Sequence, residues 1–469
     1  MPFRWNPREH LILGRFVLKW LLIAAPVGAI VGSAVALFLW ALDLATRLRW
    51  ATDTSLGLPW LLFLLPAAGI GIGLMYHRFG RSVEAGNNLI LEQIHEPGGG
   101  IPTRMAPLVL LATIITHLFG GSAGREGTAV QMGGSMASTI GRWFRFTRPD
   151  TRTLLMTGVA AGFGAVFGTP LTGAVFAVEV LAIGLVDFQS MVPCLIASIV
   201  GDGTTTAWGI HHTQYHIGAL LQSGLVHAAP GLSWLLLAKV AVASIAFGLA
   251  SVLFAELAHG CHHLFQRIVP SPIFRPAVGG LIVIALAILI GPDYLGIGVA
   301  PDPRYPHQVC ILSAFGVGGA TAWSWWWKIL FTAVTLSSGF KGGEVTPLFF
   351  VGATLGNTMA RVLHAPVDLF AGLGFVAVFA GATNTPLACT IMGIELFAPG
   401  QSDLMRSGFV VYLATACFLA YLFSGHSGVY LSQRIGSPTI PLPDLPKDAS
   451  LRTARKRQPI FGPRLFNSD

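Results

Sequence analysis

Two glutamates lie at matching positions of a repeated glycine-rich motif. Glu126 stands within residues 124–128, GREGT, and Glu344 within residues 342–346, GGEVT, so both segments read G-x-E-x-T. Glycines let a backbone approach a ligand closely, and a helix that begins there directs unbonded N–H groups and its positive dipole end toward that ligand. Two such helix ends would form an anion site, and a carboxylate beside it must be protonated or move aside when an anion binds. The pattern therefore predicts anion movement coupled to protons.

A second pair of matching segments divides the chain into two related halves. Residues 160–171 and 377–387 are runs of small and apolar residues that end on Thr-Pro-Leu, and each proline precedes a glutamate by nine positions. The glutamate motifs are 218 residues apart and the two prolines 216. We therefore predict a first transmembrane repeat over 20–215 and a second over 232–435, the arrangement of transporters built around a site at mid-membrane.

Three further charged residues near these motifs are interpreted as structural. Glu179 and Glu395, the glutamates that follow the prolines, lie in apolar segments whose symmetry suits helix-end packing or an arginine partner. Arg125 is interpreted as the partner of a buried carboxylate, because a fixed positive charge so close to an anion site would hold the anion too tightly for turnover.

The composition places these motifs in a membrane. The chain is 53% hydrophobic and 11% charged, whereas a soluble domain carries about 25% charged residues. The segments 21–42, 60–75, 234–254 and 277–290 reach or approach the ~20 apolar residues that cross a bilayer. With 56 Gly and 29 Pro, many helices must break within the bilayer, which is tolerated only inside protein or along a water-filled cavity. We predict an all-α polytopic membrane protein.

The charge distribution predicts the orientation of the chain. There are 29 Lys and Arg against 21 Asp and Glu, a net charge of +8, and ten of the basic residues lie within 4–19 and 447–464. Basic flanks stay on the cytoplasmic side, so 1–19 is expected to be a cytoplasmic N-terminal segment and 442–469 a short, basic cytoplasmic tail. This excess is a topology signal, and no nucleic-acid partner is expected.

Other chemistry was weighed against these motifs. Residues 120–124, GGSAG, match the G-x-S-x-G pattern of serine hydrolases around Ser122, but they lack the strand-to-helix turn and the partners that this chemistry needs. The histidines of 211–216 and 259–263 have no convincing metal-ligand spacing, so neither a metal nor a cofactor is expected. The scattered cysteines are interpreted as small core residues, and they are Cys194, Cys261, Cys310, Cys389 and Cys417.

Two motifs resemble one membrane-protein family. Residues 124–134, GREGTAVQMGG, resemble the GREGP-x-VQ-x-GG signature of the CLC chloride channels and anion/proton antiporters, with Thr128 where proline is usual. Residues 342–347, GGEVTP, resemble the G-G-x-F-x-P segment of the same family. The resemblance implies an inverted repeat of about 18 tilted and broken helices, a homodimer with one pathway per subunit, and Glu126 as the gating and proton-transferring glutamate. It also implies that no CBS domains follow, since the tail is short.

The inner anion motif of the family, G-S-G-I-P, is altered in this chain. Asn87 stands about forty residues before Glu126, where that motif carries its serine. Residues 98–102, GGGIP, look more similar to the motif but lie only 24 residues before Glu126, and we interpret them as unrelated to the site.

The second half also departs from the chloride antiporters. Glu344 stands where they carry a small aliphatic residue, Val345 replaces the phenylalanine, and Val180 replaces the second glutamate of their proton path. This combination is similar to the fluoride-exporting branch of the family. Residues 424–430, SGHSGVY, resemble the segment that offers its tyrosine hydroxyl, here Tyr430, to the central anion.

The resemblance therefore implies a fluoride/proton antiporter, not an enzyme, that exports fluoride across the bacterial inner membrane. Its partners would be fluoride, protons, the lipid bilayer and a second subunit. Glu126 and Glu344 would handle protons or organise the anion, and the anion-binding residues would be Asn87, Gly127, Val345, Thr346 and Tyr430. The alternatives are a chloride/proton antiporter or a voltage-gated-type chloride channel of the same fold, and more remotely an intramembrane serine hydrolase.

Overall fold

The protein is built almost entirely of helices, as the apolar composition predicts. The computed structural model describes residues 7–51, 57–218, 232–301, 305–399, 404, 407–437 and 449–457. A helix bonds all its backbone groups internally, which a lipid environment requires. In this part of the chain the only sheet pairs β1 with β2 in parallel, and each strand has two residues.

The first half contains the helices and turns from α1 to α8. In chain order they are α1 (Pro7–Trp50), η1 (Trp60–Leu64), α2 (Leu65–Met75), the π-helical turn η2 (Tyr76–Gly80), η3 (Arg81–Val83), α3 (Asn87–His95), α4 (Met105–Leu118), α5 (Glu126–Trp143), α6 (Arg148–Phe167), α7 (Pro170–Glu179), β1 (Ala182–Ile183), η4 (Phe188–Ser190) and α8 (Met191–Ala207).

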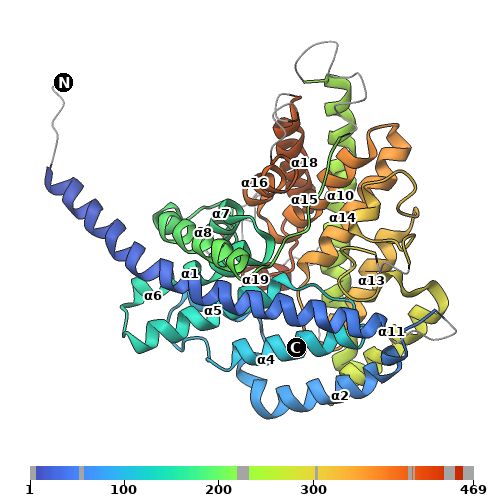
Figure 1. Cartoon of the computed structure of the whole chain (residues 1–469), viewed down its shortest axis with the longest axis horizontal. Helices are drawn as coiled ribbons and strands as arrows, with labels where there is room; N and C mark the ends of the chain where they lie inside the picture. Colours follow the sequence, from blue (N-terminus) through green and yellow to red (C-terminus); the bar gives the residue numbers. More distant parts are fainter. Residues whose placement is uncertain are drawn as a thin grey trace.

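The second half contains the elements from α10 to α19. They are α10 (Trp234–Ile268), α11 (Arg275–Ile290), η5 (Pro292–Tyr294), α12 (Ile311–Ala314), α13 (Ser324–Ser337), α14 (Val345–Leu363), α15 (Val367–Thr383), α16 (Pro386–Phe397), α18 (Phe409–Ser424), β2 (Arg434–Ile435) and α19 (Leu451–Arg457). Figure 1 shows α5 to α8 gathered on one side of the molecule, with α13 and α14 on the other.

Several of these helices are too short to cross a bilayer alone. Among the described residues, three helical stretches are long and apolar enough to span it, over His10–Trp50, Trp60–His95 and Trp234–Ile268. By contrast, apolar helices such as α7, α16 and α18 have 10 to 16 residues, whereas a span needs about 20. The broken helices expected from the glycine and proline content are therefore present.

The two halves run in opposite directions. Gly124 and Gly343, which lie at nearly equivalent positions of the two glutamate motifs, pair as an antiparallel bridge. Glu179, at the C-terminal end of α7, accepts hydrogen bonds from the N–H groups of Leu387 (3.0 Å) and Ala388 (2.7 Å) at the start of α16.

Glu395, near the end of α16, makes the reciprocal contact. Its carboxylate accepts from the N–H groups of Leu171 (2.9 Å) and Thr172 (2.8 Å) and from the Thr172 hydroxyl (2.6 Å) at the start of α7. Each glutamate therefore satisfies the free N–H groups at the other helix's N-terminus, where negative charge is stabilised. This exchange requires α7 and α16 to be antiparallel, so the predicted inverted repeat is confirmed, and both glutamates pack at helix ends as predicted.

Glycine contacts hold equivalent helix pairs together in both halves. A methyl group added at Gly133 of α5 would lie 2.1 Å from the carbonyl oxygen of Gly158 in α6. One added at Gly352 of α14 would lie 2.1 Å from the carbonyl oxygen of Gly374 in α15. Only glycine permits this backbone approach, which membrane helices use for tight packing.

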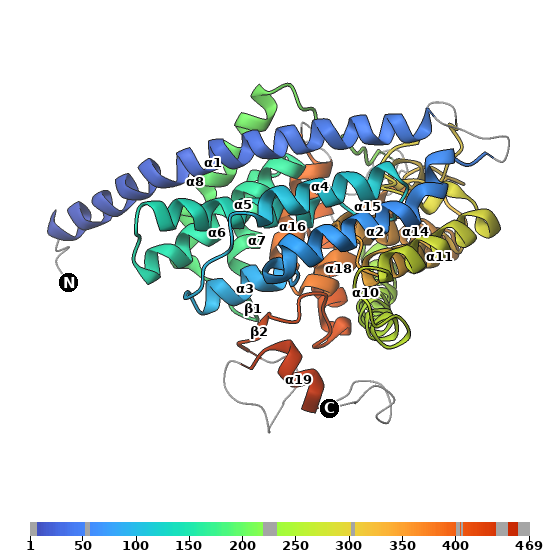
Figure 2. The ribbon, with the colours of Figure 1, turned by 90° about the horizontal axis from the view of Figure 1, so that it is seen from below.

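Helices lie within both predicted end segments. Helix α1 runs unbroken from Pro7 to Trp50, so no element boundary marks position 19. Part of the predicted tail forms α19, which lies with β1 and β2 along one edge of the molecule (Figure 2). Residues 1–6, 219–231, 438–448 and 458–469, which include parts of both predicted end segments, lie outside the described residues.

Candidate functional site: an anion site between two helix N-termini

The Glu126 carboxylate is bound by the N-terminus of the opposite repeat's helix. Glu126 is the first residue of α5 and is 1% exposed. Its Oε2 accepts hydrogen bonds from the Thr346 N–H (3.1 Å) and the Thr346 hydroxyl, at the start of α14. The backbone N–H of Arg125 also donates to this oxygen (3.2 Å). The carboxylate thus takes the donors that a small anion would need at this helix end.

Arg125 is the partner of this buried carboxylate, as predicted. Its Nε lies 3.5 Å from Glu126 Oε1. The arginine side chain is 22% exposed, so it reaches the carboxylate from a more open side of the site. A charge in this place offsets the cost of burying Glu126 in its ionised form.

Glycines bring the starts of α5 and α14 into direct contact. The Gly124 N–H donates to the Gly343 carbonyl (2.6 Å) and the Gly343 N–H donates to the Gly124 carbonyl (2.8 Å). A methyl group at Gly343 would lie 2.7 Å from the Gly127 nitrogen. The repeated glycines therefore let two positive helix ends approach one another, as the sequence predicts.

Asn87 and Glu344 meet this junction at Gly127. Asn87 begins α3, directly after Gly86, whose φ of 57° suits glycine. A methyl group at Gly127 would lie 3.0 Å from Asn87 Nδ2 and 3.6 Å from Glu344 Oε2. Asn87 Oδ1 and Glu344 Oε2 are both buried without a hydrogen-bond partner. Unpartnered buried polar atoms are costly, and because both are acceptors, a proton or a hydrogen-bond donor would satisfy them.

Val345 and Tyr430 complete the set of predicted residues. Val345 is the first residue of α14 and is 2% exposed. Tyr430 is also buried, and it lines one cavity with Asn87 and Glu344 and a second with Asn87. The structure therefore brings every residue predicted for the anion or proton site to one place.

A cavity of about 480 Å³ leads to this place, and its lining includes Asn87, Glu344 and Tyr430. Basic side chains line it as well, namely His77, Arg81, His262, Arg275 and Lys341. Arg81, Arg275 and Lys341 outnumber the acidic Glu84 and Glu344 in this lining, and an excess of positive charge raises the local concentration of anions. The cavity can therefore supply an anion to the junction of α3, α5 and α14.

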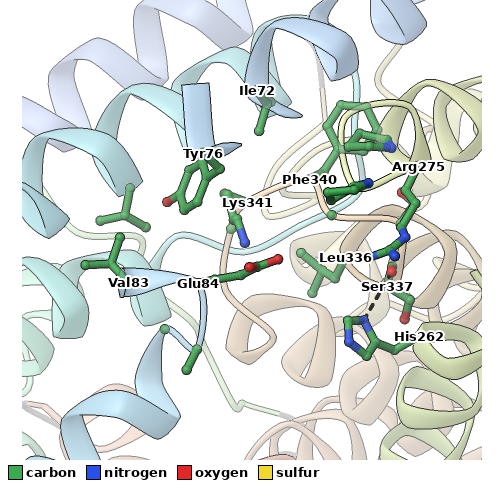
Figure 3. Close-up of a pocket in the computed structure, with 18 of the residues that line it drawn as sticks. Ile72, Tyr76, Val83, Glu84, His262, Arg275, Leu336, Ser337, Phe340 and Lys341 are labelled. Atoms are coloured by element: carbon green, nitrogen blue, oxygen red, sulfur yellow. Dashed lines mark hydrogen bonds between the residues drawn. The ribbon is translucent and has the colours of Figure 1, made fainter. Parts of the chain in front are cut away.

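Lys341 was not identified from the sequence. Its Nζ lies 4.4 Å from the centre of the Tyr76 ring, and Figure 3 shows the ammonium beside both this ring and the Glu84 carboxylate. It interacts electrostatically with Glu84 and Glu344. Its signal in the sequence is a charge three residues before Glu344, where the first repeat carries Ala123.

Val180 faces an apolar environment. It lines a small cavity together with Asn87 and Tyr430, and the remaining lining residues are Ile90, Leu91, Ile94, Val130, Val159 and Phe176. The described lining of this small cavity contains no glutamate. The larger cavity is lined by two, Glu84 and Glu344, and Glu344 is the one that lies beside Gly127.

The similar-looking segment 98–102 lies elsewhere. The Gly100 N–H donates to Gln93 Oε1 (2.9 Å) and the Ile101 N–H donates to Ser138 Oγ (2.8 Å). Ser138 lies twelve residues along α5 from Glu126, which is about 18 Å of helix. The segment therefore packs against the far part of α5, which agrees with its interpretation as unrelated to the site.

The serine of the GGSAG motif and two histidines of 259–263 make hydrogen bonds within the protein. Ser122 is buried, and its hydroxyl pairs with that of Thr332 (3.0 Å). His259 binds the Gly428 carbonyl (3.1 Å) and His262 the Ser337 carbonyl (3.3 Å). Over the ranges that the structure describes, no group of three or more His, Cys, Asp or Glu side chains could hold a metal ion.

Replacing Gly127 by alanine should reduce anion transport about tenfold. The new methyl group would lie 3.0 Å from Asn87 Nδ2 and 3.1 Å from the Gly343 Cα, so the junction must open to admit it. A loss of 1.4 kcal/mol of binding corresponds to a factor of ten. Gly71→Ala in α2 is the matched control, because nothing lies within 4 Å of its added methyl group. Anion flux from reconstituted vesicles is measured for both variants. Equal flux through the two would mean that Asn87 and Gly127 do not line the path of the anion.

Comparison with known proteins identifies the family. A sequence model described as voltage gated chloride channel matches residues 68–425. A chloride/fluoride channel protein of Pseudomonas syringae pv. tomato is 45% identical over 435 residues, which are 91% of this chain and 89% of that protein. A voltage-gated ClC-type chloride channel of Salmonella dublin is 27% identical over 432 residues, 87% of this chain and 97% of that protein.

Solved structures share the fold. The crystal structure of a CLC-type fluoride/proton antiporter is 31% identical, with a TM-score of 0.78 over 89% of this chain and 98% of that one. A slow cyanobacterial Cl⁻/H⁺ antiporter is 19% identical, with a TM-score of 0.70 over 87% of this chain and 94% of that one. This chain therefore belongs to the CLC family, to which the voltage gated chloride channel model refers, and is an anion transporter with that family's all-helical membrane fold.

Proposed function

We propose that the protein is a fluoride/proton antiporter that exports fluoride from the cytoplasm. The observation that carries this proposal is that the Glu126 carboxylate accepts hydrogen bonds from the N–H and the hydroxyl of Thr346. When ionised, Glu126 competes with fluoride for these donors. When protonated, it releases them, and the proton it carries moves inward as fluoride moves outward. Because the two states exclude one another, the movements are coupled.

Glu344 is proposed as the second carboxyl group of this exchange. Its Oε2 is buried and unpartnered beside Gly127, which favours either protonation or a hydrogen bond to a mobile donor. It would accept the proton that Glu126 delivers, or orient the Asn87 amide or the Tyr430 hydroxyl toward fluoride.

The donor set favours fluoride over chloride. Fluoride is small and strongly hydrated, so it gives up water only to several good donors. The Asn87 amide, the Thr346 hydroxyl, the Tyr430 hydroxyl and the N–H groups of the α5 and α14 starts around Gly127 and Val345 can supply them. Similarity to a CLC-type fluoride/proton antiporter agrees with this choice, whereas similarity to a chloride/fluoride channel protein agrees with either anion. An acidic medium delivers fluoride as uncharged HF, and proton-driven export would remove the trapped ion.

Reconstituted vesicles loaded with fluoride or with chloride test the proposal. We expect fluoride efflux at least about tenfold faster than chloride efflux, a difference of about 1.4 kcal/mol. Ion-selective electrodes measure both, and protein-free vesicles give the leak. Chloride efflux as fast as fluoride efflux would replace the proposal by a chloride/proton antiporter or a chloride channel of the same fold.

The remaining parts of the proposal concern assembly and placement. We place the protein in the bacterial inner membrane with both ends cytoplasmic, so an impermeant thiol reagent outside intact cells should not label a cysteine introduced at Ser450. We also propose a homodimer with one pathway per subunit. Light scattering in detergent should then give a protein mass twice the 49.7 kDa of one chain.

A further inference from the structure

Tyr430 lies in a loop whose two sides are each bound by a glutamate. Before it, the Ser427 hydroxyl donates to Glu256 Oε1 of α10 (3.3 Å). After it, the Ser432 hydroxyl donates to Glu92 Oε1 of α3 (2.8 Å). The loop that carries the tyrosine is therefore held from two separate helices.

Both glutamates also bind an arginine of the C-terminal helix α19. Arg455 Nη2 donates to Glu256 Oε2, and Arg452 Nη1 lies 3.7 Å from Glu92 Oε1. We call the two sets the Glu256 clamp (Ser427, Glu256, Arg455) and the Glu92 clamp (Ser432, Glu92, Arg452). One short helix thus closes both clamps.

Further contacts join the loop that carries Tyr430 to α3 and α19. The Ser432 N–H donates to Asn88 Oδ1 (2.9 Å), next to Asn87 at the start of α3. The Arg452 N–H donates to the Leu431 carbonyl (3.0 Å). Leu451 is fully buried against the short sheet. The position of Tyr430 is consequently tied to the helix that carries Asn87 and to α19.

The clamps differ in their access to water. The Glu92 and Arg452 side chains are 45% and 52% exposed, whereas those of Glu256 and Arg455 are 31% and 20% exposed. Exposed ion pairs are weak and are screened by salt. We therefore expect the Glu256 clamp to hold the loop that carries Tyr430 more strongly than the Glu92 clamp does.

We propose that Glu256 and Glu92 are positioning residues that hold Tyr430 at the anion site, and that α19 sets this position through Arg455 and Arg452. The role of Tyr430 at the anion rests on the proposed function, but its placement by the clamps does not. A purely structural alternative is that the ion pairs only anchor α19 to the rest of the protein.

The test places a 3-fluorotyrosine at position 430 in the full chain and records its ¹⁹F NMR signal together with fluoride efflux. Glu256→Gln keeps an acceptor for Ser427 but removes the ion pair with Arg455. We expect a shifted or broadened signal and a two- to five-fold fall in fluoride turnover, the range that a partly exposed ion pair supports. Arg455→Gln should change the NMR signal and the fluoride turnover in the same way. Arg455→Lys keeps the positive charge, so it should leave both close to their parental values. Glu92→Gln should have a smaller effect.

Lys19→Gln is the matched control, because it breaks a 2.6 Å ion pair with Asp150 between α1 and α6, away from Tyr430. It should leave the signal unchanged. If Glu256→Gln frees α19 for proteolysis but leaves the Tyr430 signal and the turnover unchanged, the clamps only anchor the tail and the proposal is wrong. The NMR result is independent of the transported ion, so failure of the fluoride proposal would appear separately, as absent fluoride efflux in the parental protein.

Discussion

Glu126→Gln should abolish fluoride-driven proton movement. Glutamine has the shape of the protonated carboxyl group but cannot release a proton, so the exchange loses its carrier. Proton flux in reconstituted vesicles should fall at least about a hundredfold, the lower range for removal of an acid-base group. A pH-sensitive dye outside the vesicles measures it while a fluoride gradient drives transport.

The control for Glu126→Gln is Glu395→Gln, which also removes a carboxylate bound to backbone N–H groups of the other repeat, although Glu395 is only partly buried. Glu395 binds Leu171 and Thr172 at the start of α7, away from the junction of α5 and α14. This variant should keep the parental ratio of protons to fluoride. Undiminished proton movement by Glu126→Gln would remove Glu126 from the mechanism.

Glu344→Ala should lower fluoride turnover about tenfold or more, or uncouple it from protons. The substitution removes the carboxyl group that, in the proposed function, accepts a hydrogen bond from Asn87 or Tyr430, and a hydrogen bond to a charged group contributes about 1.5–3 kcal/mol. Glu344→Gln separates the two roles proposed for this residue. If Glu344 only orients donors, glutamine keeps much of the turnover and the coupling ratio. If Glu344 carries a proton, glutamine uncouples transport.

Fluoride efflux and proton uptake measured on the same vesicles give the fluoride turnover and the ratio of protons to fluoride. Glu179→Gln serves as the control, because Glu179 binds the start of α16 and does not line either cavity at the site. A Glu344→Ala variant with the parental rate and ratio would show that the symmetry of the two glutamate motifs is only structural.

The residues predicted for the site lie close together in the structure, and they could be identified because their signals in the sequence are local or repeated. The G-x-E-x-T motifs fixed the starts of α5 and α14, and their glycines explain why the two helix ends can meet. Asn87 was identified by its distance from Glu126 in the sequence, although GGGIP at 98–102 matches the family motif better by composition. The structure shows why spacing is the better guide, because α3 begins against Gly127 while GGGIP packs against Ser138.

Features that depend on contacts between distant segments could not be predicted in detail. The sequence suggested helix-end packing for Glu179 and Glu395, but not that each would bind the other's helix, because partners more than 200 residues apart leave no local pattern. Lys341 breaks the repeat symmetry and so escaped a comparison of the halves. The folding of α19 against Glu92 and Glu256 was missed because a basic, polar tail carries no apolar periodicity.

The most direct test of coupled exchange is whether a pH gradient alone can drive fluoride uphill. Vesicles containing the protein would hold equal fluoride concentrations on both sides, with the membrane voltage clamped by potassium and valinomycin. Acidifying the outside should make the vesicles lose fluoride against its developing gradient, as read by a fluoride electrode, and vesicles with Glu126→Gln should show no such loss. Fluoride that stays at equal concentration in the parental vesicles, while it still flows readily down an imposed fluoride gradient, would show a passive channel and contradict the account.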